Sequence, residues 1–566
     1  MALKDIQVEN IKKSLLSKMI DRSALPYEES IQLIAKELNI SKSKVRKTLN
    51  TSLQPLIYIT NGSIVLKKNE QNLILKLCNR YASKVELKKV SSNQIEIFGK
   101  IEKINDKYVF VPNNKKRYGE CLLISETVAK AHEGHYVNCL TFEGINTLST
   151  VGFITQVIED FGSTESFSAK QQAIIAEYGL NYVYDEETQK QADEIPDGDR
   201  QQILDYIHKI NGDDWFKKFT SKLQDRTDLP ICSLDPKGAF NVDDAFYVEK
   251  LGKNKYKFYV CISHIAAFMR PNSPLVKTAL DYASDAYITG KCFSMFPYEV
   301  AKKLSIYEGK ERLVSLKEIV FDCRNGYPEI SDVKEYPAFV KSRHTLTYAD
   351  GNDIYENLNG AREKYADVAQ SVIAACEGGE IISDLLKISG ALDLETSEYN
   401  MILSKDKDKV EEVINDNGTI SHKSVEIAMK SYAKCFAVKA KYKNLNAIFR
   451  VLEKRNERQK NEIENISINF GFDAFDKDDE QNSINDMVDI AREIDYKKMK
   501  EISKDNLLTP YYYLNNMSTA EAYSRLIIIH GNKAKFSPFP LPHYAINEEV
   551  YAKITSPIRE VMCLIN

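Results

Sequence analysis

Acidic residues crowd one short stretch of this 566-residue chain, and they constrain it more than any other feature. The stretch SLDPKGAFNVDDAFYVE holds Asp235, Asn241, Asp243 and Asp244 between two apolar runs that are typical of strands. Carboxylates this close repel one another unless a positive group lies among them, and a hard divalent cation is the usual solution. A solvent-exposed turn is the alternative, because Asp, Asn, Pro and Gly are also common turn residues.

Length and composition predict a soluble protein of three or four domains. Hydrophobic residues make up 43% and charged residues 28%, and no apolar run reaches the about 18 residues of a membrane-spanning helix. The start, MALKDIQVENIKK, lacks the apolar core of a signal peptide, and the ten cysteines form no C-x-x-C pair. We therefore expect a cytoplasmic monomer without membrane contact.

Charge is distributed unevenly along the chain. Residues 1–120 carry 23 Lys and Arg against 12 Asp and Glu, whereas the whole chain has a net charge of −4. A basic amino-terminal part on an acidic body favours an anionic polymer as partner, and a merely solvated basic surface is the alternative.

Residues 1–70 have the pattern of a winged helix. Apolar residues recur at helical spacing from Tyr27 to Leu38, and Ser41 is a candidate N-cap for a second helix whose exposed face is basic. A hairpin with an Asn61-Gly62 turn follows. Such modules bind nucleic acid or other proteins, so both kinds of contact stay open.

Residues 83–160 alternate apolar and polar residues in five short runs, which suits an OB-type, cold-shock-like β-barrel. Tyr108 and Phe110, followed by the basic run Lys115, Lys116 and Arg117, predict an aromatic and basic surface for single-stranded nucleic acid. The alternatives are that the aromatic residues belong to the core and that the basic run is a solvated turn.

The pattern His132-x-x-His135 has few other potential zinc ligands nearby in the sequence. Because a zinc site needs at least three protein ligands, we interpret the two histidines as ordinary surface residues.

Residues 161–226 are polar and partly helical, a lead-in to a large domain over residues 227–566. There, the apolar run ending at Asp235 predicts a buried strand, and residues 244–263 predict a hairpin. Val425, Met429, Tyr432 and Phe436 share one face of a predicted core helix. The acidic residues 473–495 predict an exposed insertion with helical parts.

Near the end of the sequence, Ser556 and Pro557 predict a helix start, with Ser556 as N-cap and Pro557 at the first helical position. Arg559 would then lie in the first turn, where free backbone N–H groups and a guanidinium make a candidate phosphate site.

These motifs together resemble the RNB catalytic domain of the ribonuclease II and ribonuclease R family of 3′-to-5′ exoribonucleases. The matching pieces, in family order, are DLPICSLDPKGAFNVDDAFYVE (228–249), RPNSPL (270–275), Tyr287-x-x-Gly290, Met295-x-Pro297, LSI with Arg312, LTY (346–348), VE-x-AM (425–429), MSTAEAYS (517–524), HYAI (543–546) and YAKITSPIR (551–559). The resemblance implies a multidomain α+β fold: a winged helix and an OB-type barrel, followed by a large α/β RNB domain.

The resemblance also implies roles for individual residues. Asp235, Asp244 and Asn241 would hold Mg²⁺, and Asp243 and Arg559 would be catalytic. Tyr287 would stack on the terminal base of single-stranded RNA, and nucleoside 5′-monophosphates would be released.

Several residues depart from the family pattern. Asn241 stands where the family has a fourth aspartate, His264 replaces an aspartate, and Glu560 follows Arg559 where a basic residue is usual. The sequence ends soon afterwards, so we expect no carboxy-terminal S1 barrel. A Mg²⁺-dependent 3′-to-5′ exoribonuclease that acts on single-stranded RNA is the first hypothesis, and an RNB-fold protein that binds RNA without cutting it is the second.

Overall fold

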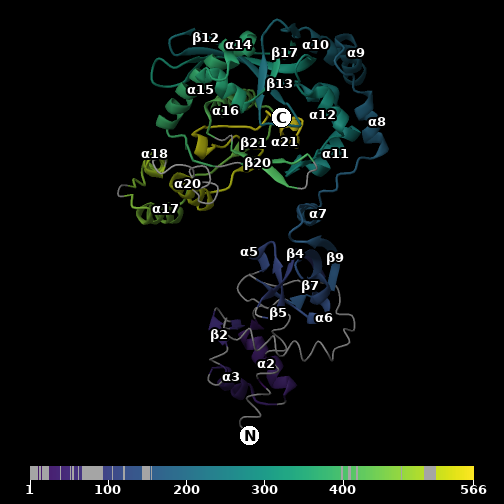
Figure 1. The fold of residues 1–566 in the computed structure, drawn as a ribbon, viewed down its shortest axis with the longest axis vertical. Coiled ribbons are helices and arrows are strands. Elements are labelled where there is room, and N and C mark those ends of the chain that lie inside the picture. Colours follow the sequence, from purple (N-terminus) through teal and green to yellow (C-terminus); the bar gives the residue numbers. More distant parts are fainter. Residues whose placement is uncertain are drawn as a thin grey trace. The chain divides into compact units, whose positions relative to one another are not determined.

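A computed structural model describes most of the chain (Figure 1). The described residues are 11, 15, 25–38, 40–50, 53, 57–60, 63–66, 94–104, 106–118, 121–142, 153–154, 156–396, 399–405, 409–415, 418–472, 475–502 and 518–566. The chain forms two compact units, residues 1–181 with 404–409, and residues 182–403 with 410–566. In the described residues, no helix is both long and apolar enough to cross a membrane.

In the first unit, the described residues between 25 and 66 form helices and a small sheet. Its elements are β1 (Leu25–Pro26), α2 (Tyr27–Glu37), α3 (Lys42–Asn50), β2 (Ile57–Thr60) and β3 (Ser63–Leu66). The strands pair in the order β1-β3-β2, and Val45 and Leu49 of α3 are buried, as their helical spacing predicts. The predicted turn residues Asn61 and Gly62 lie outside the described residues.

A six-stranded sheet with the order β8-β6-β5-β4-β7-β9 follows in the same unit. Its strands are β4 (Gln94–Ile104), β5 (Lys107–Pro112), β6 (Leu122–Ile124), β7 (His135–Phe142), β8 (Phe153–Ile154) and β9 (Gln156–Ser163). Short helices α5 (Lys115–Tyr118), α6 (Glu126–Ala129) and η2 (Lys130–His132) connect them, and α7 (Phe167–Glu177) follows. Four of the five predicted runs each form one strand, whereas the last contains both β8 and part of β9.

The second unit contains a seven-stranded sheet with the order β10-β17-β16-β13-β12-β11-β18. Its strands are β10 (Gln224–Asp225), β11 (Cys232–Asp235), β12 (Asp244–Gly252), β13 (Lys255–Ser263), β16 (Glu311–Asp322), β17 (Glu329–Lys341) and β18 (His344–Thr347). The predicted strand before Asp235 and the predicted hairpin over residues 244–263 are both confirmed.

Helices cover one face of this sheet (Figure 1). The helices are α13 (Tyr348–Glu356), α14 (Ala361–Lys364), α15 (Ala366–Ile388) and α16 (Ile420–Tyr442). Phe258, Val260 and Ile262 of β13 share a core with Val425 and Tyr432 of α16. The alternating pattern of the strand and the 3.6-residue period of the helix both predict this contact.

A second group of helices packs around the end of the sheet that holds the acidic stretch. It contains α8 (Glu186–Glu194), α9 (Arg200–Asn211), α10 (Asp213–Thr220), η3 (Ile265–Phe268), α11 (Pro274–Tyr282) and α12 (Tyr298–Leu304). The strands β14 (Ala286–Ile288) and β15 (Lys291–Phe293) form a hairpin between α11 and α12, and β19 (Tyr399–Leu403) pairs with β20 (Val410–Asn415) elsewhere in the unit.

For residues 473–495 the expected helical parts are confirmed, but the expectation of an exposed insertion or loop is wrong. Most of this segment lies in α18 (Glu480–Ile502), which packs against α17 (Glu457–Asn469) and α20 (Thr519–Ile529) (Figure 1). Ile484, Met487, Val488 and Ala491 are buried in their common core. The prediction relied on the acidic composition of the segment and missed its apolar residues, which recur at helical spacing.

The predicted helix start at Ser556 is also wrong. Residues 557–559 form a turn, and the helix α21 (Val561–Ile565) begins only after Glu560. Glu560 has an extended backbone (φ −142°) and forms an antiparallel bridge with Ser284. This tertiary contact overrides the local Ser-Pro signal.

The small remaining strands β21 (Phe449–Val451) and β22 (Lys535–Ser537) pair with each other, and η5 (Tyr544–Ile546) follows β22 in the sequence.

Candidate active site

The three predicted aspartates lie together at one edge of the seven-stranded sheet. Asp235 is the last residue of β11, Asp244 is the first of β12, and Asp243 directly precedes it. Since β11 and β12 are antiparallel, the end of one strand and the start of the other lie at the same edge. The fold therefore brings together the carboxylates that the sequence stretch predicts.

Burial makes these carboxyl groups hard to ionise. Asp243 is 2% exposed and Asp244 is 8% exposed. Burial raises the pKa of Asp243 to about 7, although the nearby Arg559 acts in the opposite direction. Burial also raises the pKa of Asp235 and Asp244. A cation among the three groups would favour their charged forms.

Arg559 is the positive group beside this cluster. Its Nε lies 3.3 Å from Oδ2 of Asp243, and the backbone N–H of Ile558 donates to Oδ1 of the same carboxylate at 2.7 Å. The Arg559 side chain is 42% exposed, whereas that of Asp243 is 1% exposed. Asp243 thus holds the turn and one edge of the Arg559 guanidinium. The rest of the guanidinium is partly exposed and can contact an anionic substrate.

Asn241, which we predicted as a metal ligand, is held in one orientation by a residue that the motif search missed. Its amide nitrogen donates to Oδ2 of Asp285 at 2.7 Å. A carboxylate accepts hydrogen bonds, so the amide nitrogen must face Asp285 and the amide oxygen must point away. That buried oxygen has no hydrogen-bond partner.

Asp285 collects further hydrogen bonds in the same place. Its carboxylate accepts from the hydroxyl of Tyr287 at 3.1 Å, the hydroxyl of Ser294 at 3.1 Å and the N–H of Met295 at 2.7 Å. Burial raises its pKa, and these hydrogen bonds oppose that effect. A carboxylate two positions before the predicted stacking residue was a signal in the sequence that we did not use.

Tyr287 lies in β14 with 53% of its surface exposed. Its hydroxyl is tied to Asp285, so the ring is held beside the aspartate cluster while much of it stays accessible. This placement fits a ring that stacks on a base.

The donor set fits a hard divalent cation. Oδ2 of Asp235 and Oδ1 of Asn241 are buried without hydrogen-bond partners, and oxygens are the ligands that Mg²⁺ takes. In the described residues, Asp235, Asp243 and Asp244 are not among the groups of three whose ligand atoms all lie within 4.8 Å of one another.

Arg312, which belongs to the motif of LSI followed by an arginine, stabilises the acidic loop through intervening residues. It is buried, its Nε donates to the carbonyl of Ser305 at 2.8 Å, and Asp197 accepts from its guanidinium at 3.0 Å. The N–H of Ile306 and the hydroxyl of Ser305 in turn bind the backbone of Val242. This set of contacts positions the loop between Asn241 and Asp243.

Two of the departures from the family pattern have local partners. Glu560 forms an ion pair with Lys553, so its negative charge is balanced next to Arg559. His264 packs edge-to-face on Phe219 with ring centroids 5.8 Å apart, and burial lowers its pKa to about 4. His264 is therefore a neutral packing residue at physiological pH.

The predicted nucleic-acid residues of the first unit lie on β5 and α5. Tyr108 is half-buried and donates its hydroxyl to Glu133 at 3.0 Å, and Phe110 is fully buried in the core. Lys115, Lys116 and Arg117 form α5, and the side chains of Lys115 and Arg117 are exposed. The basic run is thus a short surface helix, not a turn.

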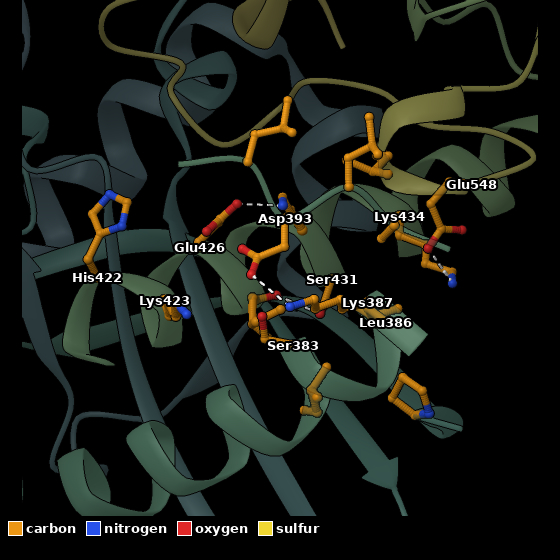
Figure 2. A pocket seen from close by; sticks show the side chains of 18 of the residues that line it. Ser383, Leu386, Lys387, Asp393, His422, Lys423, Glu426, Ser431, Lys434 and Glu548 are labelled. Atoms are coloured by element: carbon orange, nitrogen blue, oxygen red, sulfur yellow. Dashed lines mark hydrogen bonds and ion pairs between the residues drawn. The ribbon is translucent and has the colours of Figure 1, made fainter. Parts of the chain in front are cut away.

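A cavity of about 560 Å³ lies elsewhere in the second unit, between α15, α16 and residues 391–396 (Figure 2). Its lining contains none of the predicted site residues. Lys434 pairs with Glu548 at 2.7 Å and Lys387 with Asp393 at 3.7 Å, so much of its charge is already balanced. This cavity is therefore separate from the candidate active site.

Residues 223–566 match the family model for the RNB domain. The chain therefore belongs to the RNB-domain family. Among curated relatives, Ribonuclease R 2 of Lactococcus lactis is 26% identical over 353 residues, which cover 61% of this chain and 49% of the relative. Ribonuclease R of Aquifex aeolicus is 22% identical over 472 residues, covering 82% of this chain and 60% of the relative. The chain spans about half the length of several such relatives.

Solved structures show the same fold. Mycoplasma genitalium RNase R in complex with ribose methylated single-stranded RNA has a TM-score of 0.60 and 18% identity, with 84% of this chain and 68% of that chain covered. Yeast Ssd1, described as a pseudonuclease, has a TM-score of 0.53 and 13% identity, with 85% and 55% covered.

Proposed function

We propose that this chain is a 3′-to-5′ exoribonuclease that hydrolyses single-stranded RNA to nucleoside 5′-monophosphates with Mg²⁺. One observation carries the proposal. Buried oxygens of Asp235 and Asn241 lack hydrogen-bond partners, and Asp243 forms an ion pair with Arg559, in a member of the RNB-domain family. The ribonuclease R relatives support this reaction class.

In this proposal Asp235, Asn241 and Asp244 hold Mg²⁺, which would lower the pKa of a bound water and offset charge on the scissile phosphate. Asp243 is the catalytic carboxylate, and the 3.3 Å contact of its Oδ2 keeps Arg559 in place. The guanidinium of Arg559 stabilises the charge that develops on the phosphate oxygens.

Substrate recognition follows from the exposed groups. The ring of Tyr287 stacks on the terminal base, which requires an unpaired strand. We further propose that residues 1–70 form a winged-helix domain and residues 83–160 a cold-shock-like barrel. Their basic helices α3 and α5 then bind the RNA backbone.

The test uses a 5′-labelled oligo(A) with and without Mg²⁺. Stepwise shortening and mononucleotide release are expected from the wild-type chain, and Asp243→Asn should slow them by about 10²-fold or more. Asp228→Asn is the matched control, because that aspartate precedes the neighbouring strand β11 and its side chain is 75% exposed. No shortening at high enzyme concentration, or equal shortening by Asp243→Asn, would contradict the proposal.

The second candidate is an RNB-fold protein that binds RNA without cutting it. Asn241 favours it, since a neutral amide attracts a cation less strongly than a carboxylate. This candidate predicts saturable RNA binding by the wild-type chain with no Mg²⁺-dependent products in the same assay.

A further inference from the structure

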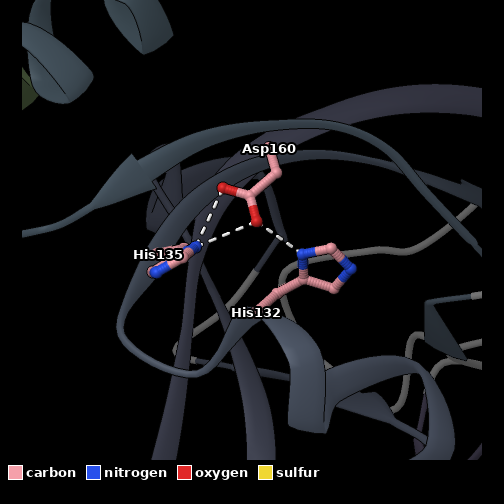
Figure 3. A group of neighbouring side chains, drawn as sticks. All are labelled: His132, His135 and Asp160. Carbon is pink, nitrogen blue, oxygen red and sulfur yellow. Dashed lines mark hydrogen bonds and ion pairs between the residues drawn. The ribbon is translucent and has the colours of Figure 1, made fainter.

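Three potential metal ligands meet in the first unit, outside the candidate active site (Figure 3). In the part of the chain that the structure describes, His132, His135 and Asp160 each offer a ligand atom within 4.8 Å of the other two. The two imidazole rings approach the carboxylate from opposite sides (Figure 3). Our interpretation of His132 and His135 as ordinary surface residues overlooked the third ligand.

Strand pairing supplies that third ligand. His132 ends η2 and His135 begins β7, whereas Asp160 lies on the neighbouring strand β9. The register of β7 and β9 shifts beside Val137, which pairs with Asp160, so β9 has a bulge next to the cluster. Bulges often re-aim a side chain near a functional site.

Gly162 completes this local geometry. Its φ of 99° is one that glycine adopts easily, and its N–H donates to Oδ1 of Asp160 at 2.8 Å. This bond fixes the carboxylate, which then faces Nδ1 of His132 at 2.5 Å and Nδ1 of His135 at 2.9 Å. A hydrogen bond from behind a ligating carboxylate is the usual support in metal sites.

We propose that His132, His135 and Asp160 bind a divalent transition-metal ion of the zinc class. Two imidazole nitrogens with one carboxylate oxygen suit such an ion better than Mg²⁺ or Ca²⁺, which take oxygen ligands. Ligand atoms in tetrahedral zinc sites lie about 3.3 Å apart, so each histidine would move away from Asp160 by less than about 1 Å. Three protein ligands leave one coordination position open, and the ion would join the η2–β7 corner to β9.

The test is a Co²⁺ titration of the chelator-treated full chain in excess Mg²⁺, which occupies oxygen-donor sites. The wild-type chain should take up one equivalent of Co²⁺ with the visible absorption of a nitrogen-containing site. His135→Ala and Asp160→Asn should each weaken this binding at least about tenfold. His208→Ala is the control, because His208 also contacts an aspartate, Asp213, at 2.6 Å but belongs to no such cluster.

A second measurement needs no variant. Zn²⁺ should protect His132 and His135 of the wild-type chain from acylation by diethyl pyrocarbonate, as mapped by mass spectrometry, and should leave His208 reactive. Absence of saturable Co²⁺ uptake, uptake unchanged in His135→Ala, or equal acylation with and without Zn²⁺ would show that the cluster is only a hydrogen-bonded His–Asp–His group. Neither measurement depends on ribonuclease activity.

Discussion

Asn241 and Asp285 illustrate how one substitution depends on its neighbour. An aspartate at position 241 would place a second carboxylate about where the amide nitrogen now lies, 2.7 Å from Oδ2 of Asp285. Two buried carboxylates at that distance cannot both ionise without a large cost. The amide is therefore matched to Asp285, and its free oxygen is a consequence of that match.

This match predicts that restoring the family residue alone will fail. Asn241→Asp should lower Mg²⁺-dependent RNA hydrolysis by about tenfold, because a proton shared with Asp285 weakens the cation site. Asn241→Asp combined with Asp285→Ser removes the repulsion and should recover at least wild-type activity. Initial rates on labelled oligo(A) at several Mg²⁺ concentrations provide the measurement.

Asp285→Ser alone is the necessary comparison for that pair. It frees the amide of Asn241 to rotate and should raise the Mg²⁺ concentration needed for half-maximal rate. A single Asn241→Asp variant that outperforms the wild type would refute the argument, since it would show that Asp285 does not limit the site.

Among the helices and strands, the hydrophobic pattern of the sequence predicted those elements that interactions between neighbouring residues determine. The β12–β13 hairpin and the core face of α16 follow from periods of 2 and 3.6 residues. The turn at residues 557–559 does not, because the bridge between Ser284 and Glu560 joins distant segments.

The candidate sites divide in the same way. Asp235, Asp243 and Asp244 lie within ten residues of sequence, so their proximity was predictable. Asp160 reaches His132 and His135 only through strand pairing and a bulge, which no local pattern encodes.

A buried ion pair ties α16 to the strands β16 and β17. Nζ of Lys317 is 3.0 Å from Glu335 and 4.0 Å from the ring centroid of Tyr432, and Lys439 reaches the same glutamate at 2.6 Å. The Lys317 side chain is only 2% exposed. Removing the charge of its partner leaves a buried ammonium poorly compensated.

Glu335→Gln should therefore lower the free energy of unfolding by about 2 kcal/mol at neutral pH, measured by urea denaturation. Lys317→Met added to Glu335→Gln should regain much of the loss, because no charge is then left buried. Glu549→Gln is the matched control: its carboxylate is 90% exposed and pairs with Lys441, so the change should be under about 0.5 kcal/mol.

The same pair predicts a pH dependence. Burial acts to raise the pKa of Glu335, but Lys317 and Lys439 overcome it and hold the pKa at about 2, below the usual 4.5. A depressed pKa in the folded state gives stability that is complete above about pH 4.5 and is lost as the pH falls towards 2. The difference between wild type and Glu335→Gln should thus shrink between pH 5 and pH 3, and a constant difference would contradict this assignment.

For the whole molecule, the charge distribution is the main feature. Residues 1–120 carry 23 Lys and Arg against 12 Asp and Glu, and α5 presents Lys115 and Arg117 to solvent. Lysines and arginines that contact phosphates release counterions when RNA binds, so the binding constant falls as salt rises.

Lys115→Ala/Arg117→Ala should weaken binding to single-stranded oligo(A) and reduce the slope of log K against log salt by about 1.4, which is about 0.7 for each lost phosphate contact. Fluorescence anisotropy in the presence of a chelator measures binding without cleavage. Lys170→Ala, an exposed lysine on α7 of the same unit, should leave the slope nearly unchanged. Equal slopes for the double variant and the wild type would exclude α5 from the RNA contact.

The hydrogen bond from Ile558 to Asp243 spans 315 positions of the sequence. During synthesis on the ribosome, Asp243 emerges long before Ile558, which binds it, and Arg559, which pairs with it. A nascent chain can therefore fold most of the sheet while its candidate active site is still incomplete. In the proposed ribonuclease, this order of assembly would delay activity until Ile558 and Arg559 have been translated and have packed against Asp243.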